Sequence, residues 1–570
     1  MLIQPLTANN GDRKTVNYRD ILENIRLAFP QPTSDPIHDS YFVHSIMRAL
    51  DQVDALKTHL PMLGSIVSGD FEKARQTTLP DAMSSVEDVT AELIGYLRGM
   101  TIFGHPRTQQ NVVPPTTIPS VIGVLIASLY NPNIAWDEYS HLVALAEVEV
   151  VGMTAKMVGY DAEKASGVFT FGGTGTTLYG VKLGLEKACP GTMQNGTPEE
   201  AVVFVSDAGH YCATNIVGWL GIGTNNLVTI PTTYENEIDL AQLEAAAREA
   251  LTNGKKIAAI IATLGTTDAF GLDDLESIVA LRDTLVDEFQ LEYRPHIHAD
   301  AVIGWAWSVF NDYDVEENPL GFRPRTVRAL AGACRRIQHL SLADSVGIDF
   351  HKTGFTPYIS SLVLVKDQED LDLVKRQPEQ MPYLYHFGEH RPGMYTLETS
   401  RAGTGPLAAL ANLRLFGEQG LRAILGHIVE MTQLLREHLE GHAGTTVLNR
   451  DNFGTVTLFR AYPEGVDTFS IKRQEFEDAA YRERLLVHNT YNREIFQYVH
   501  SEAMEGRGVV ISTTECYRQT HYGEPIVALK SYILSPFVDE TDVKTVVDKI
   551  LEAREKVAGN GTRATASNGA

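Results

Sequence analysis

The spacing of apolar residues changes twice along the chain and divides it into three regions. Residues 1–115 carry apolar side chains at helical spacing, as in the series Val43, Ile46, Met47, Leu50 and Val53. From about residue 120 to 400, short apolar runs alternate with amphipathic segments, which predicts parallel strands joined by helices. After Gly403, a helix through Leu415 leads to a smaller region of helices and strands. The pattern therefore predicts an α/β protein.

We expect the domains to follow these changes. The predicted units are a helical segment, a large domain, a small α+β domain and a disordered tail, at residues 1–115, 116–415, 416–557 and 558–570. The clearest elements of the large domain are three strands and two helices, at Ala201–Val205, Ala258–Leu264, His296–Ala301, Asp239–Leu251 and Asp274–Phe289. Strands of the small domain are expected within Thr445–Phe459 and Gly508–Ser512.

The composition narrows the possible partners. The 570 residues include 72 acidic and 48 basic side chains, and the net charge of −24 argues against binding to nucleic acid or to anionic membranes. No apolar run approaches the ~18 residues of a membrane helix, and the polar N-terminus has no signal-peptide core. The four cysteines are widely spaced, so we expect reduced thiols, no metal site and a cytoplasmic enzyme.

A glycine-rich turn is the first candidate for a binding site. The apolar segment Gly167–Phe171 leads into Gly172-Gly173-Thr174-Gly175, and Leu178–Ala188 has helical spacing. Glycines let a phosphate approach the backbone, and the N–H groups at a helix start attract anions. The spacing fits neither a Walker loop nor a dinucleotide turn. An ordinary turn between strand and helix is the alternative.

Three polar residues follow apolar strands. Lys352 ends the segment Asp349-Phe350-His351-Lys352, and its apolar surroundings predict a lowered pKa and the ability to form a Schiff base. Asp300 falls at a strand end and needs a cation such as a pyridinium nitrogen, unless it caps a helix. His210 could stack on an aromatic ligand or be an ordinary loop histidine. A surface lysine is the alternative for Lys352.

Together these segments resemble the group II pyridoxal-phosphate-dependent amino-acid decarboxylases, and most closely the branch of the bacterial tyrosine decarboxylases. The matching segments are Gly172-Gly173-Thr174, His210-Tyr211, Ala262–Thr267, His298–Ala301, Asp349–Lys352, and the flanking His105–Arg107, Tyr130–Asn133, Leu145–Val150 and Leu397–Gly403. The chain departs from the family pattern at Val302, where alanine is frequent, and at Phe350, where proline is frequent.

The resemblance implies pyridoxal-phosphate fold type I, with a mostly parallel central sheet, and a role for each matching residue. Lys352 would hold the cofactor, Asp300 would keep its ring nitrogen protonated, and His210 would stack on the ring. Further contacts would come from residues around the ring and the phosphate, namely Gly173, Thr174, Gly175, Thr267, Ser345 and His351. A tyrosine on a loop after the lysine would deliver the final proton, and we favour Tyr385 over Tyr383.

The implied reaction is the decarboxylation of an L-amino acid to its amine, in a homodimer whose subunits share active sites. Alternatives are a carbon–carbon lyase of the sphingosine-phosphate-lyase type, a decarboxylative aldehyde synthase and a non-catalytic homologue. The presence of Lys352, Asp300 and His210 argues against a non-catalytic homologue. Residues 106–119 include no aromatic side chain, and Val302 adds bulk, so both favour a small or aliphatic substrate. The segment 109–111 could bind a polar one.

Overall fold

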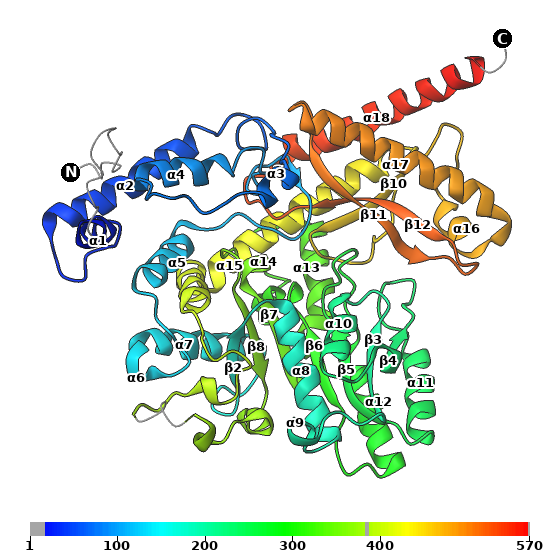
Figure 1. The fold of residues 1–570 in the computed structure, drawn as a ribbon. Helices are drawn as coiled ribbons and strands as arrows, with labels where there is room; N and C mark the ends of the chain where they lie inside the picture. The colour runs from blue at the N-terminus through cyan, green and yellow to red at the C-terminus, as the bar shows by residue number, and fades with distance from the viewer. Residues whose placement is uncertain (1–17, 382–386, 568–570) are drawn as a thin grey trace.

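The centre of the fold is a seven-stranded sheet (Figure 1), in a computed structural model that describes residues 18–381 and 387–567. In spatial order its strands are β2 (Ser166–Thr170), β8 (Ser361–Val365), β7 (Ser345–Asp349), β6 (His296–Asp300), β5 (Lys256–Thr263), β3 (Ala201–Ser206) and β4 (Leu227–Ile230). Only β8 runs antiparallel to its neighbours in this sheet. The predicted α/β class and the three predicted strands β3, β5 and β6 are confirmed.

Helices cover both faces of this sheet, as the predicted alternation requires. They are α5 (Ile118–Tyr130), α6 (Asp137–Ser140), α7 (Leu142–Met157), α8 (Gly173–Ala188), α9 (Thr192–Asn195), α10 (Cys212–Trp219), α11 (Leu240–Thr252), α12 (Leu275–Phe289), α13 (Pro324–Ile337) and α14 (Phe350–Thr353). The predicted helices at 239 and 274 begin one residue later. Asp239 and Asp274 are N-caps, and each side chain accepts a backbone N–H of the first turn.

A second sheet forms the small domain, at the upper right of Figure 1. Its order is β1 (Thr108–Gln109), β11 (Val510–Gln519), β12 (Pro525–Tyr532), β10 (Val456–Ala461) and β9 (Thr445–Val447), with helices α16 (Ile471–Glu477), α17 (Arg482–Met504) and α18 (Glu540–Ser567). Strand β1 belongs to the predicted N-terminal segment, yet it pairs with β11. Helix α18 extends through residues 558–567, where we expected a disordered tail.

The large and small domains are joined by a long helix, α15 (Thr404–Glu440). The predicted boundary at residues 415–416 falls inside this helix, beside a kink at Gly417, where φ is 52°. Glycine tolerates this left-handed conformation without the steric cost that a Cβ would add. One helix therefore crosses the predicted boundary and changes direction near it.

Four N-terminal helices lie above the central sheet in Figure 1: α1 (Tyr18–Leu27), α2 (Pro36–Asp54) and α4 (Val86–Gly95) at the upper left, and the short α3 (Phe71–Arg75) nearer the centre. No residue of these four helices is buried within the described parts of the chain. Across residues 18–381 and 387–567, no helix combines the length and apolar composition that crossing a bilayer requires.

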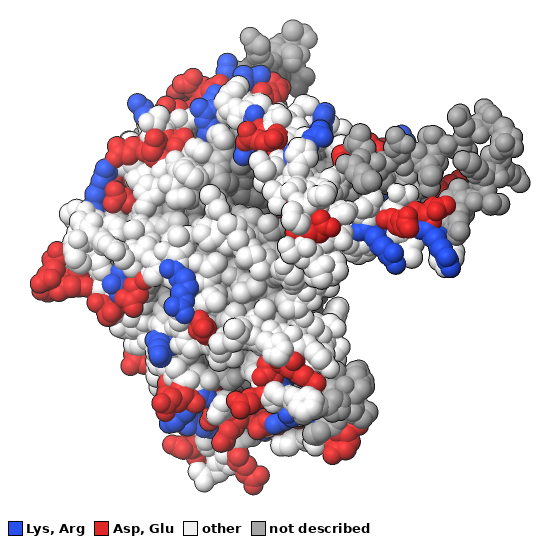
Figure 2. All heavy atoms as spheres, turned by 90° about the vertical axis from the view of Figure 1, so that its left-hand side faces the viewer, with Lys and Arg blue, Asp and Glu red and all other residues white. Residues whose placement is uncertain are grey.

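One face of the molecule carries a broad apolar surface. Figure 2 shows it as a large area without charge, with acidic and basic residues concentrated toward its rim. Exposed apolar side chains of α5 and α7 contribute to this side, namely Ile118, Val121, Ile122, Leu125, Ile126, Leu142, Leu145 and Val148. We call this set the α5/α7 face. A contiguous apolar surface of this kind marks an interaction site.

Candidate active site

Three predicted site residues meet at one edge of the central sheet. Asp300 ends β6, His210 follows β3, and Lys352 follows β7. These strands are parallel, so their carboxyl ends point to the same edge, where open α/β sheets bind ligands. Asp300 interacts electrostatically with both Lys352 and His210. The structure therefore places the predicted lysine, carboxylate and histidine around one space.

Lys352 forms an ion pair that the sequence did not suggest. Its Nζ lies 2.8 Å from Oδ2 of Asp349, whose side chain is almost completely buried. Burial alone would lower the pKa of Lys352, but the carboxylate of Asp349 outweighs burial, and the pKa is raised. The expected lowering of this pKa is therefore wrong. Lys352 is a partly buried cation with a specific, buried counterion.

The buried carboxylate of Asp300 has one oxygen without a hydrogen-bond donor among the described residues. The carboxylate is buried, which raises its pKa, and Oδ1 has no hydrogen-bond partner among the described residues. A buried acceptor without a donor costs free energy, so a protonated ring nitrogen at this position would be stabilising. Burial lowers the pKa of His210, and its ring lies 4.3 Å from the ring of Tyr211.

The glycine-rich turn begins α8 beside these residues. No described side chain caps the helix, so N–H groups of its first turn can bind an external anion. A Cβ at Gly173 would lie 2.9 Å from Oδ2 of Asp349, and one at Gly175 would lie 2.4 Å from Oγ1 of Thr170. Both positions require glycine, and the turn fits a phosphate group.

Of two further predicted cofactor contacts, Ser345 lies away from the site, whereas Thr267 follows the carboxyl end of β5 at the same edge of the sheet. Ser345 is at the opposite end of β7 from Asp349, and its Oγ lies 2.8 Å from a ring nitrogen of both His296 and His298. This hydroxyl is buried and already hydrogen-bonded to the two histidines, so we do not assign Ser345 to the phosphate site. Thr267 follows β5 with an exposed side chain. His351 lies at the site, with Nε2 3.5 Å from Oδ2 of Asp349.

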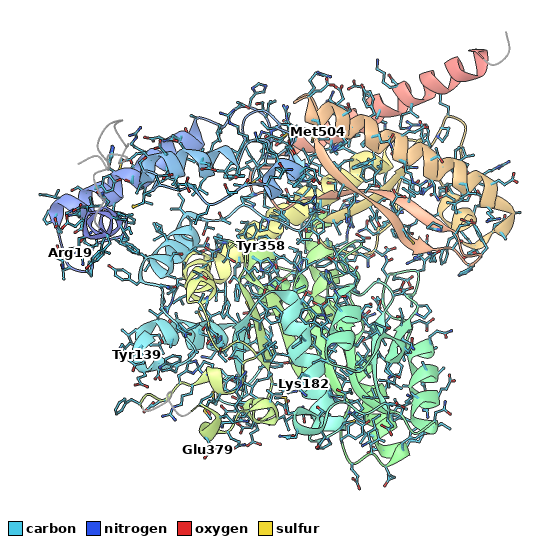
Figure 3. All side chains as sticks on the ribbon, in the orientation of Figure 1. Arg19, Tyr139, Lys182, Tyr358, Glu379 and Met504 are labelled. Atoms are coloured by element: carbon cyan, nitrogen blue, oxygen red, sulfur yellow. The ribbon has the colours of Figure 1, made fainter. Side chains whose placement is uncertain are left out.

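Tyr383 and Tyr385 lie outside the described residues, but the segment that follows them is attached to α6. The N–H of Glu389 donates to Oδ2 of Asp137 at 2.9 Å, and the N–H of Asp137 donates to the carbonyl of His390 at 3.1 Å. Figure 3 labels Glu379, shortly before this segment, far from Tyr358, which lies close to Lys352 in sequence. The loop therefore starts well away from the Lys352 site of its own chain.

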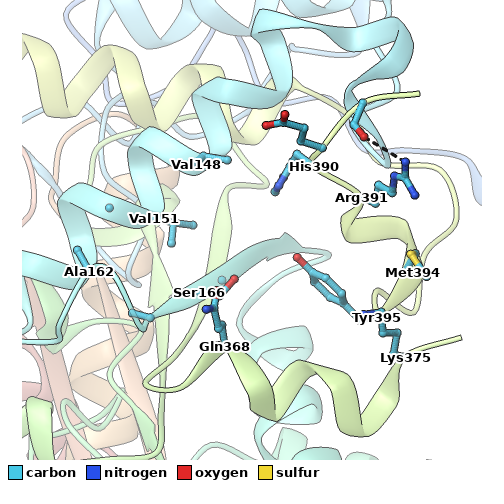
Figure 4. Close-up of a pocket in the computed structure, with 15 residues that line it drawn as sticks. Val148, Val151, Ala162, Ser166, Gln368, Lys375, His390, Arg391, Met394 and Tyr395 are labelled. Carbon is cyan, nitrogen blue, oxygen red and sulfur yellow. Dashed lines mark hydrogen bonds between the residues drawn. The ribbon is translucent and has the colours of Figure 1, made fainter. Parts of the chain in front are cut away.

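A cavity of about 660 Å³ lies beside this attachment (Figure 4). Residues of α7, β2 and the segment 388–395 line it, and Lys352, Asp300 and His210 are not among them. Its His390 ring approaches Glu147, with 3.5 Å between Nε2 and Oε2. Glu147 in turn pairs with Arg401. The cavity is therefore separate from the candidate active site and borders a buried ion pair.

Several contacts in and around the site were not predicted from the sequence. Asp349 stood in the matching motif without a role, although its spacing of three from Lys352 allows contact on a helical turn. Tyr358 packs on His351 with ring centroids 4.2 Å apart. Gln109 was a candidate for a polar substrate, but it is fully buried and its Oε1 accepts the hydroxyl of Ser531. Gln109 is therefore a structural residue.

Comparison with known proteins agrees with this geometry. The family described as "Pyridoxal-dependent decarboxylase conserved domain" matches residues 70–461. An L-2,4-diaminobutyrate decarboxylase of Acinetobacter baumannii is 26% identical over 80% of this chain and 81% of its own length. An L-tyrosine decarboxylase of Enterococcus faecium is 26% identical over 62% of each chain.

Solved structures share the fold. The glutamate decarboxylase domain of a Vibrio parahaemolyticus protein superimposes with a TM-score of 0.72 at 17% identity, over 94% of this chain and 99% of that one. The Oryza sativa TDC with PLP and tryptamine gives a TM-score of 0.71 at 17% identity, over 92% of this chain and 99% of that one. The chain belongs to the pyridoxal-dependent decarboxylase family, and it is a pyridoxal-phosphate-dependent amino-acid carboxy-lyase of fold type I.

Proposed function

We propose that the protein converts an L-amino acid into the corresponding amine and CO2 at the Lys352 site. The observation that carries the proposal is the convergence of Lys352, the unpartnered Oδ1 of Asp300, and the glycine turn of α8 around one space. Bound pyridoxal phosphate supplies an electron-withdrawing ring that accepts the electron pair left when CO2 departs.

Each residue has a defined task. Lys352 would hold the cofactor through its Nζ, and the first turn of α8 would hold the phosphate. Asp300 would accept a hydrogen bond from the ring nitrogen and keep that nitrogen protonated. The imidazole of His210 would pack on the ring and exclude water from one side. A tyrosine hydroxyl, which we assign to Tyr385, would supply the proton that completes the amine.

We further propose that the active unit is a homodimer formed through the α5/α7 face. The eight exposed apolar side chains of this face form the kind of surface that rarely stays uncovered, and a two-fold partner is the commonest cover. The segment that follows Tyr385 is attached to α6, next to this face, and Glu379, which precedes the tyrosine, lies far from Tyr358 of the same chain. In a dimer the loop would therefore serve the site of the partner subunit.

One assay tests the reaction and its alternatives. The protein loaded with pyridoxal phosphate is incubated with each of the twenty amino acids, and CO2, amine, aldehyde and ammonia are measured. The proposal expects CO2 and amine in equal amounts from at least one amino acid, and neither from Lys352→Ala. Aldehyde with ammonia as the main product would instead indicate an aldehyde synthase. Cleavage of a phosphorylated amino alcohol would indicate a carbon–carbon lyase.

The cofactor site has its own test. Borohydride reduction of the loaded protein should fix a pyridoxyl label on Lys352, which peptide mapping can locate. Lys187 is a suitable comparison, because it is also partly buried and forms a 2.6 Å ion pair with Asp370. Its Nζ lies 3.3 Å from Nδ1 of His296, at the opposite end of β6 from Asp300. A label on Lys187 or on any lysine other than Lys352 would overturn the site assignment.

A further inference from the structure

The carboxylate of Asp349 lies at the edge of the proposed phosphate site. Its Oδ2 is so close to the first residue of α8 that a Cβ added to Gly173 would lie 2.9 Å away. The Oγ of Ser361 donates to Oδ1 at 2.6 Å and fixes the carboxylate in this position. A phosphate on the first turn of α8 would therefore face a second anion in a buried site, where like charges repel strongly.

In the structure, Lys352 is the cation that balances Asp349, with 2.8 Å between Nζ and Oδ2. Four other titratable groups interact with Asp349. They are His351 on α14, Tyr358 after α14, Asp300 at the end of β6 and His210 after β3. Among these described groups Lys352 is the single permanent cation. The site therefore depends on one lysine for its charge balance.

His351 is arranged to hold a proton beside Asp349. Its Nδ1 lies 3.1 Å from the carbonyl oxygen of Ser360 and 3.3 Å from the backbone N of Ser360, whose N–H donates to it. Its Nε2 faces Oδ2 of Asp349 at 3.5 Å. A neutral imidazole donates at only one of its two nitrogens, whereas a second ring proton would let His351 donate to both the Ser360 carbonyl and Asp349.

We propose that Asp349 and His351 retain the proton that Lys352 gives up when pyridoxal phosphate binds. This inference rests on the proposed cofactor site. The ammonium of Lys352 would lose three protons on forming a double bond to the aldehyde carbon, two of them in the water that leaves and one as a free proton. Asp349 would then face the phosphate without its counterion. The retained proton takes over the role of the lysine charge, so Asp349 acts as a positioning residue that links cofactor affinity to pH.

Calorimetric titration of pyridoxal phosphate into the full chain measures this proton directly. The titration is repeated in buffers of different ionisation enthalpy, because the dependence of the observed heat on the buffer gives the number of protons exchanged with solvent. We expect the wild type to release about one proton fewer per site than Asp349→Asn. Linkage of one proton also makes the wild-type affinity fall about tenfold per pH unit on the alkaline side, relative to Asp349→Asn.

Ser361→Ala is the matched control, because it removes the hydrogen bond to Asp349 but keeps the charge, and it should exchange the same number of protons as the wild type. If Asp349→Asn does not fold, as judged by circular dichroism, Asp349→Ser replaces it. An equal net proton release in the wild type and the neutral variant, with cofactor bound to both, would overturn the inference alone. A wild type that binds no pyridoxal phosphate at Lys352 would instead refute the proposed function.

Discussion

The guanidinium of Arg401 and the carboxylate of Glu147 form an ion pair that is closed to solvent, with 3.0 Å between Nη1 and Oε2. Oε1 of Glu147 also accepts the N–H of Phe169 at 2.8 Å, and Nη1 of Arg401 donates to the carbonyl of Ile134. The backbone N–H of Arg401 donates to Oδ1 of Asn133. Three segments that matched the family in sequence therefore meet at one structural ion pair.

Glu147→Gln should be strongly destabilising, because it leaves the Arg401 guanidinium buried without a counterion. Breaking one side of a buried pair costs about 3–5 kcal/mol. Glu149→Gln is the matched control on the same helix, since Glu149 forms a more exposed pair with Arg414 and should change stability by less than about 1 kcal/mol. Thermal or denaturant unfolding at fixed protein concentration measures both. Equal effects of the two changes would contradict the assigned role.

The same pair predicts a pH dependence of stability. Burial opposes ionisation of Glu147, but Arg401 and His390 outweigh it and lower the pKa from 4.5 to about 2. Because the folded-state pKa is depressed, the contribution is complete above pH 4.5 and is lost as the pH falls toward 2. The difference in unfolding free energy between wild type and Glu147→Gln should therefore shrink over this interval. A difference that stays constant to pH 2.5 would contradict the pKa shift.

Asp300→Asn should retain the cofactor and lose turnover. The amide keeps the size of the carboxylate but removes the charge that holds the ring nitrogen protonated. We expect cofactor absorbance to persist while turnover falls by several orders of magnitude. Asp349→Asn is an informative comparison in the same site, because it neutralises a carboxylate that does not face the ring nitrogen in our assignment. Near-normal turnover of Asp300→Asn would mean that another group pairs with the ring.

Charge introduced into the α5/α7 face should dissociate the dimer. Ile126 is half exposed on α5, and Ile126→Glu places a carboxylate where we expect an apolar contact. Phe469→Ser is the control, because Phe469 is 98% exposed but lies on the small domain. Light scattering should report a dimer for wild type and Phe469→Ser, and a monomer without activity for Ile126→Glu. A fully active monomer would exclude shared active sites.

The loop tyrosine can be tested by its product. In Tyr385→Phe, CO2 release should continue more slowly, while aldehyde and ammonia replace part of the amine, because protonation no longer competes well with oxygen. Tyr383→Phe is the matched control and should have a smaller effect. The reverse order of effects would mean that Tyr383 is the donor.

Mixed dimers decide which subunit supplies the tyrosine. A dimer of one Lys352→Ala chain and one Tyr385→Phe chain has a single site with a lysine. If the tyrosine comes from the partner, that site is intact and forms amine. If it comes from the same chain, the site has phenylalanine and forms aldehyde. Product analysis of purified mixed dimers distinguishes the two arrangements.

Much of the fold follows from local pattern. The strands β3, β5 and β6 were predictable because continuous apolar runs are typical of buried parallel strands. The positions of Lys352, Asp300 and His210 near one sheet edge were predictable because each lies at or within four residues of the end of such a run. The pKa of Lys352 was not, since it depends on the side-chain direction of Asp349 across a buried turn. Phe350 fixes that turn by packing on Trp305, with ring centroids 4.8 Å apart.

Contacts between segments that are distant in sequence could not be predicted from the local pattern of apolar residues. Thr108–Gln109 is too short to be recognised as a strand, and Ser345 gave no sign that two buried histidines would occupy its hydroxyl. Both depend on segments that are distant in sequence. The loop tyrosines remain a prediction, because they lie outside the described residues.

The pairing of β1 with β11 has a consequence for biosynthesis. Thr108 lies beside Val510, so the edge of the small sheet is completed by a strand that leaves the ribosome about 400 residues earlier. Strand β1 stays unpaired until β11 has been synthesised, while the large domain can fold in the meantime. A nascent chain stalled in the small domain would therefore expose unpaired strand edges, which are the segments that chaperones protect and that aggregation recruits.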